Sequence, residues 1–150
     1  MVQKTFPKEI NLLDTFPNIS RDIKARTINK EQNRSLALKF GKEYFDGSRD
    51  QGYGGYKYDG RWIKVAEKII KIFNLKNNSK FLDIGCAKGY LMYDLHNINR
   101  FIEIQGIDIS EYAKLNSPQL IRDKIQILDC KNINFPDNYF DCVVSINTVH

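Results

Sequence analysis

Apolar and polar positions in the second half of the chain follow two different periods. Between residues 62 and 73 apolar side chains recur at helical spacing, which predicts an amphipathic helix with one buried face. Four short apolar runs predict buried strands at residues 80–84, 102–108, 125–128 and 140–146. Helical patterns separate the first three runs, at residues 88–97 and after residue 110. Strands that alternate with helices predict a parallel sheet with right-handed crossovers, so we expect an α/β fold.

The first part of the chain lacks such a pattern. Pro7 and Pro17 interrupt residues 1–20, and the polar stretch 21–44 predicts one exposed helix. We therefore divide the chain into an irregular or helical extension, residues 1–43, and one domain, residues 44–150.

Composition excludes several classes of protein. The net charge is +5, with 17 Lys and Arg against 9 Asp and Glu in residues 1–80, and 6 against 9 afterwards. Such a basic segment is more often a solvated helix face than a nucleic-acid surface, so we expect no nucleic-acid partner. We find no apolar stretch of membrane-spanning length and no signal-peptide pattern at the start, and we expect a cytoplasmic protein. Three widely spaced cysteines predict free thiols and no metal site.

The most informative segment is Phe-Leu-Asp-Ile-Gly-Cys-Ala-Lys-Gly at residues 81–89. A short strand ends near Asp83, glycines follow at Gly85 and Gly89, and a helical pattern begins. A sharp turn from strand to helix lets a ligand approach bare backbone. The carboxylate of Asp83 would repel an anion and attract an ammonium group, so the pattern favours a ligand with a cationic end.

Two interpretations of this loop compete. The dinucleotide fingerprint requires Gly-x-Gly-x-x-Gly, whereas Ala87 and Tyr90 stand at its second and third glycine positions, which weakens a nicotinamide-dependent oxidoreductase. Residues 82–89 instead resemble the first motif of class I S-adenosylmethionine-dependent methyltransferases. One departure is Ala87, where that family usually has glycine. Alanine is tolerable there unless the position needs a positive φ.

Two further segments strengthen the resemblance. Asp108 ends the second predicted strand at the distance expected for a ribose-binding acid, although Asp108 or Ser110 would also suit a helix N-cap. Residues 129–141 resemble the run that leads from an adenine-contacting acid to the fourth strand in small-molecule methyltransferases, with Ile133 and Asn134 in place of Leu-Pro.

The resemblance implies a methyltransferase that binds S-adenosylmethionine. It implies that the methionine end lies at Asp83 and the 85–89 loop, and the ribose at Asp108. The implied cofactor contacts are Asp83, Gly85, Cys86, Ala87, Gly89, Asp108, Ile109, Asp129 and Cys130. The segment after the fourth strand, residues 147–150, lacks the Asn/Asp-Pro-Pro-Tyr/Phe pattern of enzymes that methylate base amines. We therefore expect a small-molecule acceptor, such as a sugar or metabolite hydroxyl. A non-catalytic binding fragment or scaffold subunit stays open as an alternative.

The family fold has seven strands, and we count four. We therefore expect a Rossmann-like parallel sheet with flanking helices that corresponds to the N-terminal portion of that fold. The fourth strand would be an exposed edge. Either the chain is a fragment, or another chain covers this edge by self-association.

Glycines and aromatic residues at 44–62 predict a lid over the cofactor. An ordinary surface loop whose aromatic residues pack on the first helix stays open as an alternative. Tyr56 and Arg61 belong to this lid, and Arg61 suits the carboxylate of methionine or of the substrate. His150 follows the fourth strand and is the candidate general base, because histidine titrates near neutral pH.

Overall fold

The computed structural model describes residues 10–17 and 29–148. In chain order the elements are α1 (Lys30–Ala37), α2 (Lys42–Asp46), α3 (Ile63–Ile72), β1 (Lys80–Ile84), α4 (Tyr90–Ile98), β2 (Glu103–Asp108), α5 (Glu111–Leu115), α6 (Gln119–Arg122), β3 (Ile125–Ile127), the 3-10 helix η2 (Cys130–Asn132) and β4 (Cys142–Ser145). None of the helices in these ranges is long and apolar enough to cross a membrane.

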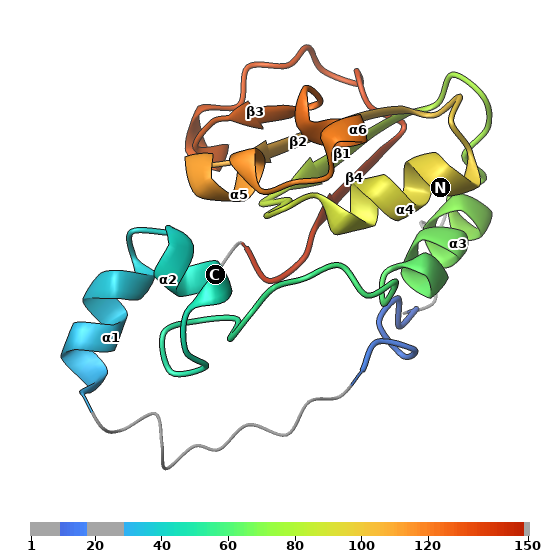
Figure 1. Cartoon of the computed structure of the whole chain (residues 1–150). Coiled ribbons are helices and arrows are strands. Elements are labelled where there is room, and N and C mark those ends of the chain that lie inside the picture. Colours follow the sequence, from blue (N-terminus) through green and yellow to red (C-terminus); the bar gives the residue numbers. More distant parts are fainter. Residues whose placement is uncertain (1–9, 18–28, 149–150) are drawn as a thin grey trace, which may run out of the picture.

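All four predicted strands form one parallel sheet with the order β3-β2-β1-β4. Phe81 of β1 pairs with Ile104 of β2 on one side and with Cys142 of β4 on the other. The chain leaves β1 toward β2 and later returns to the opposite side of β1, so the strand order reverses there. Ligands of open α/β sheets bind outside the carboxyl ends of the strands at this reversal. Figure 1 shows α2 on the side of the sheet toward which β4 runs.

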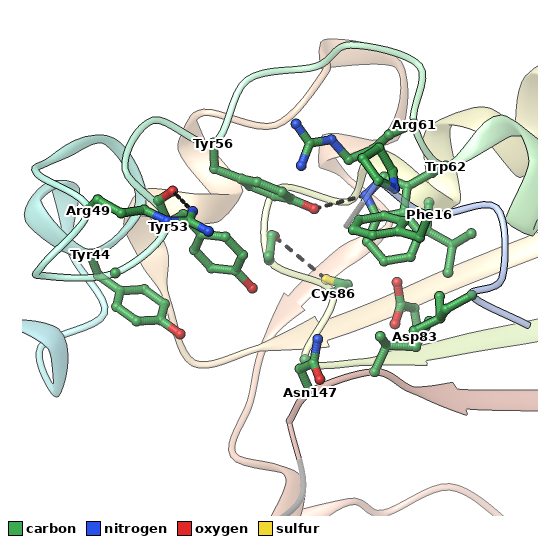
Figure 2. Close-up of a pocket in the computed structure, with 17 residues that line it drawn as sticks. Phe16, Tyr44, Arg49, Tyr53, Tyr56, Arg61, Trp62, Asp83, Cys86 and Asn147 are labelled. Carbon is green, nitrogen blue, oxygen red and sulfur yellow. Dashed lines mark hydrogen bonds between the residues drawn. The ribbon is translucent and has the colours of Figure 1, made fainter. Parts of the chain in front are cut away.

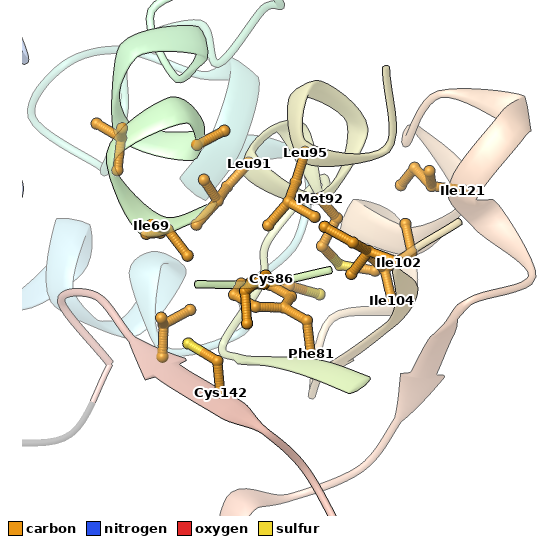
Figure 3. Close-up of a cluster of buried hydrophobic side chains, with 14 of the residues drawn as sticks. Ile69, Phe81, Cys86, Leu91, Met92, Leu95, Ile102, Ile104, Ile121 and Cys142 are labelled. Carbon is orange, nitrogen blue, oxygen red and sulfur yellow. The ribbon is translucent and has the colours of Figure 1, made fainter. Parts of the chain in front are cut away.

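The hydrophobic core lies between one face of the sheet and the helices α3 and α4 (Figure 3). Ile69 of α3 and Leu95 of α4 are fully buried against Phe81 of β1. The helical spacing in residues 62–73 therefore predicted the buried face, with one exception. Phe73 is 48% exposed because the helix ends at Ile72 and Phe73 follows as its C-cap.

The segment before the sheet differs from its prediction. In place of one helix over residues 21–44, the described part holds two, α1 and α2, and residues 21–28 lie outside it. No residue of α1 is buried, whereas Phe45 of α2 is 2% exposed. A five-residue helix shows no clear periodicity, so the pattern of apolar residues did not reveal α2.

Gly89 starts α4 in a left-handed conformation, with φ of 69°. A Cβ atom at this position would lie 2.5 Å from Cδ1 of Ile121 in α6, which is closer than two carbon atoms can pack. Glycine at this position thus allows both the left-handed backbone and the close approach of α6. This is also why α4 begins at Tyr90, two residues after the predicted start.

We expect Gly89→Ala to lower the free energy of unfolding by about 2–4 kcal/mol, since it adds backbone strain and a clash. Gly55→Ala is the matched control, because Gly55 also has a positive φ, 95°, but nothing lies within 4 Å of its Cβ position. The control isolates backbone strain and should cost about 1 kcal/mol. Urea unfolding measures both variants, and equal losses would contradict the packing role of Gly89.

Candidate functional site

The turn from β1 to α4 is left-handed at three of its five residues. Gly85, Ala87 and Gly89 have φ of 72°, 52° and 69°. The backbone N–H groups of Gly85 and Cys86 both donate to the carbonyl of Ile107 in β2, at 2.8 and 3.1 Å. Ala87 therefore has the positive φ at which a residue other than glycine adds backbone strain of about 1 kcal/mol.

Asp108 at the end of β2 holds this turn. Its Oδ2 accepts a hydrogen bond from the N–H of Ala87 at 2.7 Å, and its Oδ1 accepts from the N–H of Ser110 at 2.9 Å. The hydroxyl of Ser110 accepts from the N–H of Ala113 at 3.0 Å and is the N-cap of α5. Capping thus falls to Ser110, and the Asp108 carboxylate, half-buried, faces a cavity.

Two adjoining cavities flank the turn. The larger has a volume of about 640 Å³, and Figure 2 shows it beneath the segment that connects α2 to α3. Of the predicted cofactor residues, it is lined by Tyr56, Arg61, Asp83, Gly85, Cys86 and Ala87. The smaller, of about 350 Å³, is lined by Gly85, Ala87, Asp108, Ile109, Asp129 and Cys130. Gly89 lines neither cavity, and His150 lies outside the described residues.

Asp83 is the buried charge of the larger cavity. Its side chain is 5% exposed, and none of the hydrogen bonds among the described residues reaches it. Burial, with a smaller effect of the Asp108 charge, raises the pKa of the Asp83 carboxyl to about 7. A carboxylate in this position lacks a positive partner, so a cationic ligand group would be bound favourably beside it.

Lys88 connects the turn to the α2 segment. Its side chain is 4% exposed, and its ammonium donates to both carboxylate oxygens of Asp46, at 2.8 and 2.7 Å, and to the carbonyl of Tyr56 at 2.8 Å. The Tyr112 hydroxyl donates to Asp46 at 2.7 Å, and the Tyr90 hydroxyl donates to the Tyr56 carbonyl at 3.1 Å. We call these five residues the Lys88 cluster. It holds the predicted lid segment against the turn, α4 and α5.

Aromatic side chains of the 44–62 segment form the roof of the larger cavity. In Figure 2 the hydroxyls of Tyr44, Tyr53 and Tyr56 point into the cavity. The hydroxyl of Tyr56 accepts a hydrogen bond from Nε1 of Trp62 at 3.1 Å. These rings pack on Ala87 and on residues of α4 and α5, and not only on α3.

The surroundings of Arg61 and Cys86, two of the predicted cofactor residues, limit what their side chains can do. The guanidinium of Arg61 lines the cavity, but its Nε and one terminal nitrogen donate to Asp59, at 2.9 and 2.5 Å. Burial raises the pKa of the Cys86 thiol well above its ordinary value, so this thiol stays protonated and is a poor nucleophile.

Comparison with known proteins bears on the identity of this site. Residues 82–150 match a family described as the methyltransferase domain. The arginine-hydroxylase NDUFAF5, mitochondrial, of Rattus norvegicus is 27% identical over 147 residues, which cover 97% of this chain and 36% of that protein. Phosphoethanolamine N-methyltransferase of Triticum aestivum is 25% identical over 93 residues, which cover 58% of this chain and 18% of the relative.

A solved structure supports the same fold. The plantazolicin methyltransferase BpumL, in complex with a pentazolic desmethylPZN analog and SAH, superposes with a TM-score of 0.53. It is 22% identical and covers 75% of this chain and 48% of its own. The chain thus spans about half of that structure and about a fifth to a third of the two curated relatives. The prediction from the motifs is confirmed: the chain has part of the class I methyltransferase fold.

We expect Asp83→Asn to stabilise the chain in a pH-dependent manner. Folding raises the pKa of Asp83 from 3.8 to about 7, so the wild type loses stability as the pH rises through this window. Asparagine carries no charge, and the variant should gain about 2–4 kcal/mol at pH 8 and almost nothing at pH 4. Urea unfolding at both pH values measures this, with the exposed Asp137→Asn as control. A gain independent of pH would contradict the assignment.

Proposed function

We propose that this chain is the cofactor-binding part of an S-adenosylmethionine-dependent methyltransferase that acts on a small molecule. The observation that carries the proposal is the pair of carboxylates at adjacent strand ends. Asp83 is buried without a partner among the described residues, and Asp108 faces the neighbouring cavity across a left-handed turn. One acid suits an ammonium group and the other suits a pair of ribose hydroxyls.

The larger cavity suits the methionine end of the cofactor. Asp83 would bind the ammonium, since its burial without a partner is costly until a cation arrives. Arg61 would bind the carboxylate with the donors that Asp59 leaves unused. The backbone of the turn, from Gly85 to Ala87, lines the same cavity and lets the ligand approach closely.

The smaller cavity suits the adenosine end. Asp108 would accept from the ribose hydroxyls with the lone pairs that Ala87 and Ser110 leave free. Asp129 and Cys130 lie at the start of η2 and line the same cavity. The carboxylate of Asp129 would accept a hydrogen bond from the adenine amino group. Ile109, which is 47% exposed, would cover one face of the ring.

Methyl transfer requires position more than covalent chemistry from the protein. When bound, the cofactor would supply a methyl group on a positively charged sulfur, for transfer to a nucleophilic atom of the acceptor. The chain's own residues hold both partners in line and exclude water from the larger cavity. The Lys88 cluster would keep the lid segment over the cavity during this step.

The acceptor would enter the larger cavity from its aromatic side. Phe16 and Trp62 pack together there, with ring centroids 4.6 Å apart, and both line the cavity. This lining suits a small molecule with an apolar or planar part and a nucleophilic hydroxyl. The relatives named phosphoethanolamine N-methyltransferases support a small acceptor in general.

A fold alone does not fix a reaction, and a relative named as an arginine-hydroxylase aligns with 97% of this chain at 27% identity. The alternative that predicts a different result is a subunit without catalytic activity. A non-catalytic binding subunit would bind the cofactor without turnover. Release of S-adenosylhomocysteine in the presence of an acceptor supports methyl transfer, whereas binding without release supports the subunit.

We also propose a cytoplasmic location and pairing of the β4 edge with another chain. The three cysteines are free, as is typical of a reducing compartment. Val143 of β4 is 51% exposed, and among the described strands β4 pairs only with β1. Light scattering of the purified chain would give twice the monomer mass if the edge pairs, and a monomer would reject this pairing.

We expect S-adenosylmethionine and S-adenosylhomocysteine to bind, and nicotinamide dinucleotides not to bind. Asp108→Ala should weaken the binding of S-adenosylmethionine by about 2–3 kcal/mol, because it removes charge-assisted acceptors. Isothermal titration calorimetry measures all of these. Since both oxygens of Asp108 also hold the turn, Asp108→Asn is the milder comparison, because it keeps the shape of the side chain and one of the two acceptor oxygens. Binding of the dinucleotide alone would reject the proposal.

We propose His150 as the general base for a hydroxyl acceptor, from its place in the sequence after β4. With an identified acceptor, His150→Ala should lower kcat most between pH 6 and 9 and leave the affinity for the cofactor unchanged. An unchanged rate over this range would exclude His150, and Asn147, which lines both cavities, would then be tested.

A further inference from the structure

The larger cavity carries one more positive charge than the methionine end of the cofactor can use. Among the described residues, the charged side chains that line it are Arg49, Arg61 and Asp83. An ammonium group at Asp83 and a carboxylate at Arg61 would account for two of these three, which leaves Arg49. The cofactor has a single carboxylate, so an anionic partner of Arg49 would belong to another molecule.

The position of Arg49 separates it from the methionine end of the cavity. In Figure 2, Asp83 and Arg61 lie on one side of the Tyr53 ring. Arg49 lies on the other side of this ring and lines the same cavity. The ammonium and the carboxylate of methionine are attached to one carbon atom. A carboxylate whose ammonium group is bound at Asp83 is therefore too close to that end to reach Arg49.

The chain holds the side chain of Arg49 in place. One of its terminal nitrogens donates to the carbonyl of Tyr53. Its aliphatic part lies over Gly54, which has a φ of 72° and where a Cβ atom would come within 2.9 Å of Cδ of Arg49. The N–H of Gln51 donates to the carbonyl of Ser48 at 3.0 Å and closes the turn that contains Arg49. A guanidinium held in this way loses little conformational freedom when it binds a ligand.

The guanidinium of Arg49 also has no acidic partner. None of the ion pairs among the described residues includes it, and it is exposed, so a ligand can reach it. The Arg61 guanidinium, by contrast, donates to Asp59 through two of its nitrogens. The planar donors of an arginine match a carboxylate or a phosphate, because either group accepts two parallel hydrogen bonds. Arg49 therefore keeps the larger unmet charge of the two arginines.

Tyr53 connects this anion site to the place where the two ends of the cofactor would meet. Arg49 lines only the larger cavity, whereas Tyr53, whose carbonyl holds Arg49, lines both cavities. The Tyr53 and Tyr56 rings pack together, with centroids 4.5 Å apart, and both line the larger cavity. A molecule bound at Arg49 would therefore have apolar rings beside it and the boundary between the cavities within its reach.

We propose, resting on the proposed function, that the methyl acceptor carries an anionic group, a carboxylate or a phosphate, and that Arg49 binds this group. The anionic group positions the acceptor and is separate from the atom that receives the methyl group. Arg49 thus determines which acceptors the site selects. A neutral acceptor of the same shape would lose the paired hydrogen bonds and would leave the guanidinium without a partner.

The test uses the 150-residue chain saturated with S-adenosylhomocysteine, and it compares the anions benzoate and phenyl phosphate with neutral benzamide. Isothermal titration should show the wild type binding at least one of the anions more tightly than benzamide. Arg49→Gln should weaken the binding of that anion by about tenfold to hundredfold, as expected for lost charge-assisted hydrogen bonds, and change the affinity for benzamide by less than about twofold. The anion that the wild type binds more tightly distinguishes a carboxylate site from a phosphate site.

Two further variants are the matched controls. Lys57→Gln removes a positive charge from the same segment, but Lys57 is exposed and lines neither cavity, so every affinity should stay unchanged. Arg61→Gln should weaken the binding of S-adenosylhomocysteine. Once this variant is saturated with that ligand, its affinity for the anions should equal that of the wild type.

Anion binding that depends on Arg49 and not on Lys57, with an unchanged affinity for S-adenosylhomocysteine, supports the proposal. Anion binding that survives Arg49→Gln, or no anion binding to the saturated wild type, overturns it and leaves the proposed function standing. A loss of affinity for S-adenosylhomocysteine in Arg49→Gln would assign this arginine to the cofactor and would also overturn it. If the wild type does not bind S-adenosylhomocysteine, the proposed function fails and this proposal fails with it.

Discussion

The site depends on one backbone constraint, the left-handed turn between β1 and α4. Gly85, Ala87 and Gly89 all have a positive φ, and the N–H groups of the turn are held by β2. The backbone of this turn, at Gly85 and Ala87, lines both cavities. The two carboxylates, Asp83 and Asp108, face these cavities from adjacent strands. A relaxed turn would separate them from the backbone that a ligand must approach.

The same turn also positions the segment that precedes the sheet. Lys88 is buried within it, and its ammonium is satisfied by Asp46 and the carbonyl of Tyr56. Loss of one partner from such a buried ion pair typically costs about 3–5 kcal/mol, because the other charge stays buried. The roof of the larger cavity therefore depends on a side chain of the turn itself. The turn thus lines both cavities next to the two carboxylates, and its Lys88 holds the roof segment in place.

The sequence predicted the sheet and its acids well, because both follow from local patterns. Apolar runs identified the four strands, and the spacing of Asp83, Gly85 and Asp108 identified the turn and its neighbour. The contact of Lys88 with Asp46 was not predictable in this way, since 42 residues separate the two and neither lies in a pattern that pairs them.

Two other features were missed for related reasons. The helix α2 is too short for periodicity, so the prediction placed its residues in a single long helix and in the lid. Tyr53 lines both cavities, and its position depends on how three aromatic rings pack, which no spacing in the sequence reveals. By contrast, the sequence analysis could state that alanine at position 87 is unfavourable if the backbone there has a positive φ. Ala87 does have a positive φ.

The central claim is that the cofactor lies across the turn with its two ends in different cavities. A crystal structure of the chain with S-adenosylhomocysteine tests this most directly. The account predicts the amino group at Asp83 and the ribose hydroxyls at Asp108. A ligand whose adenosine end occupies the larger cavity, or which lies away from the 85–89 turn, would contradict it.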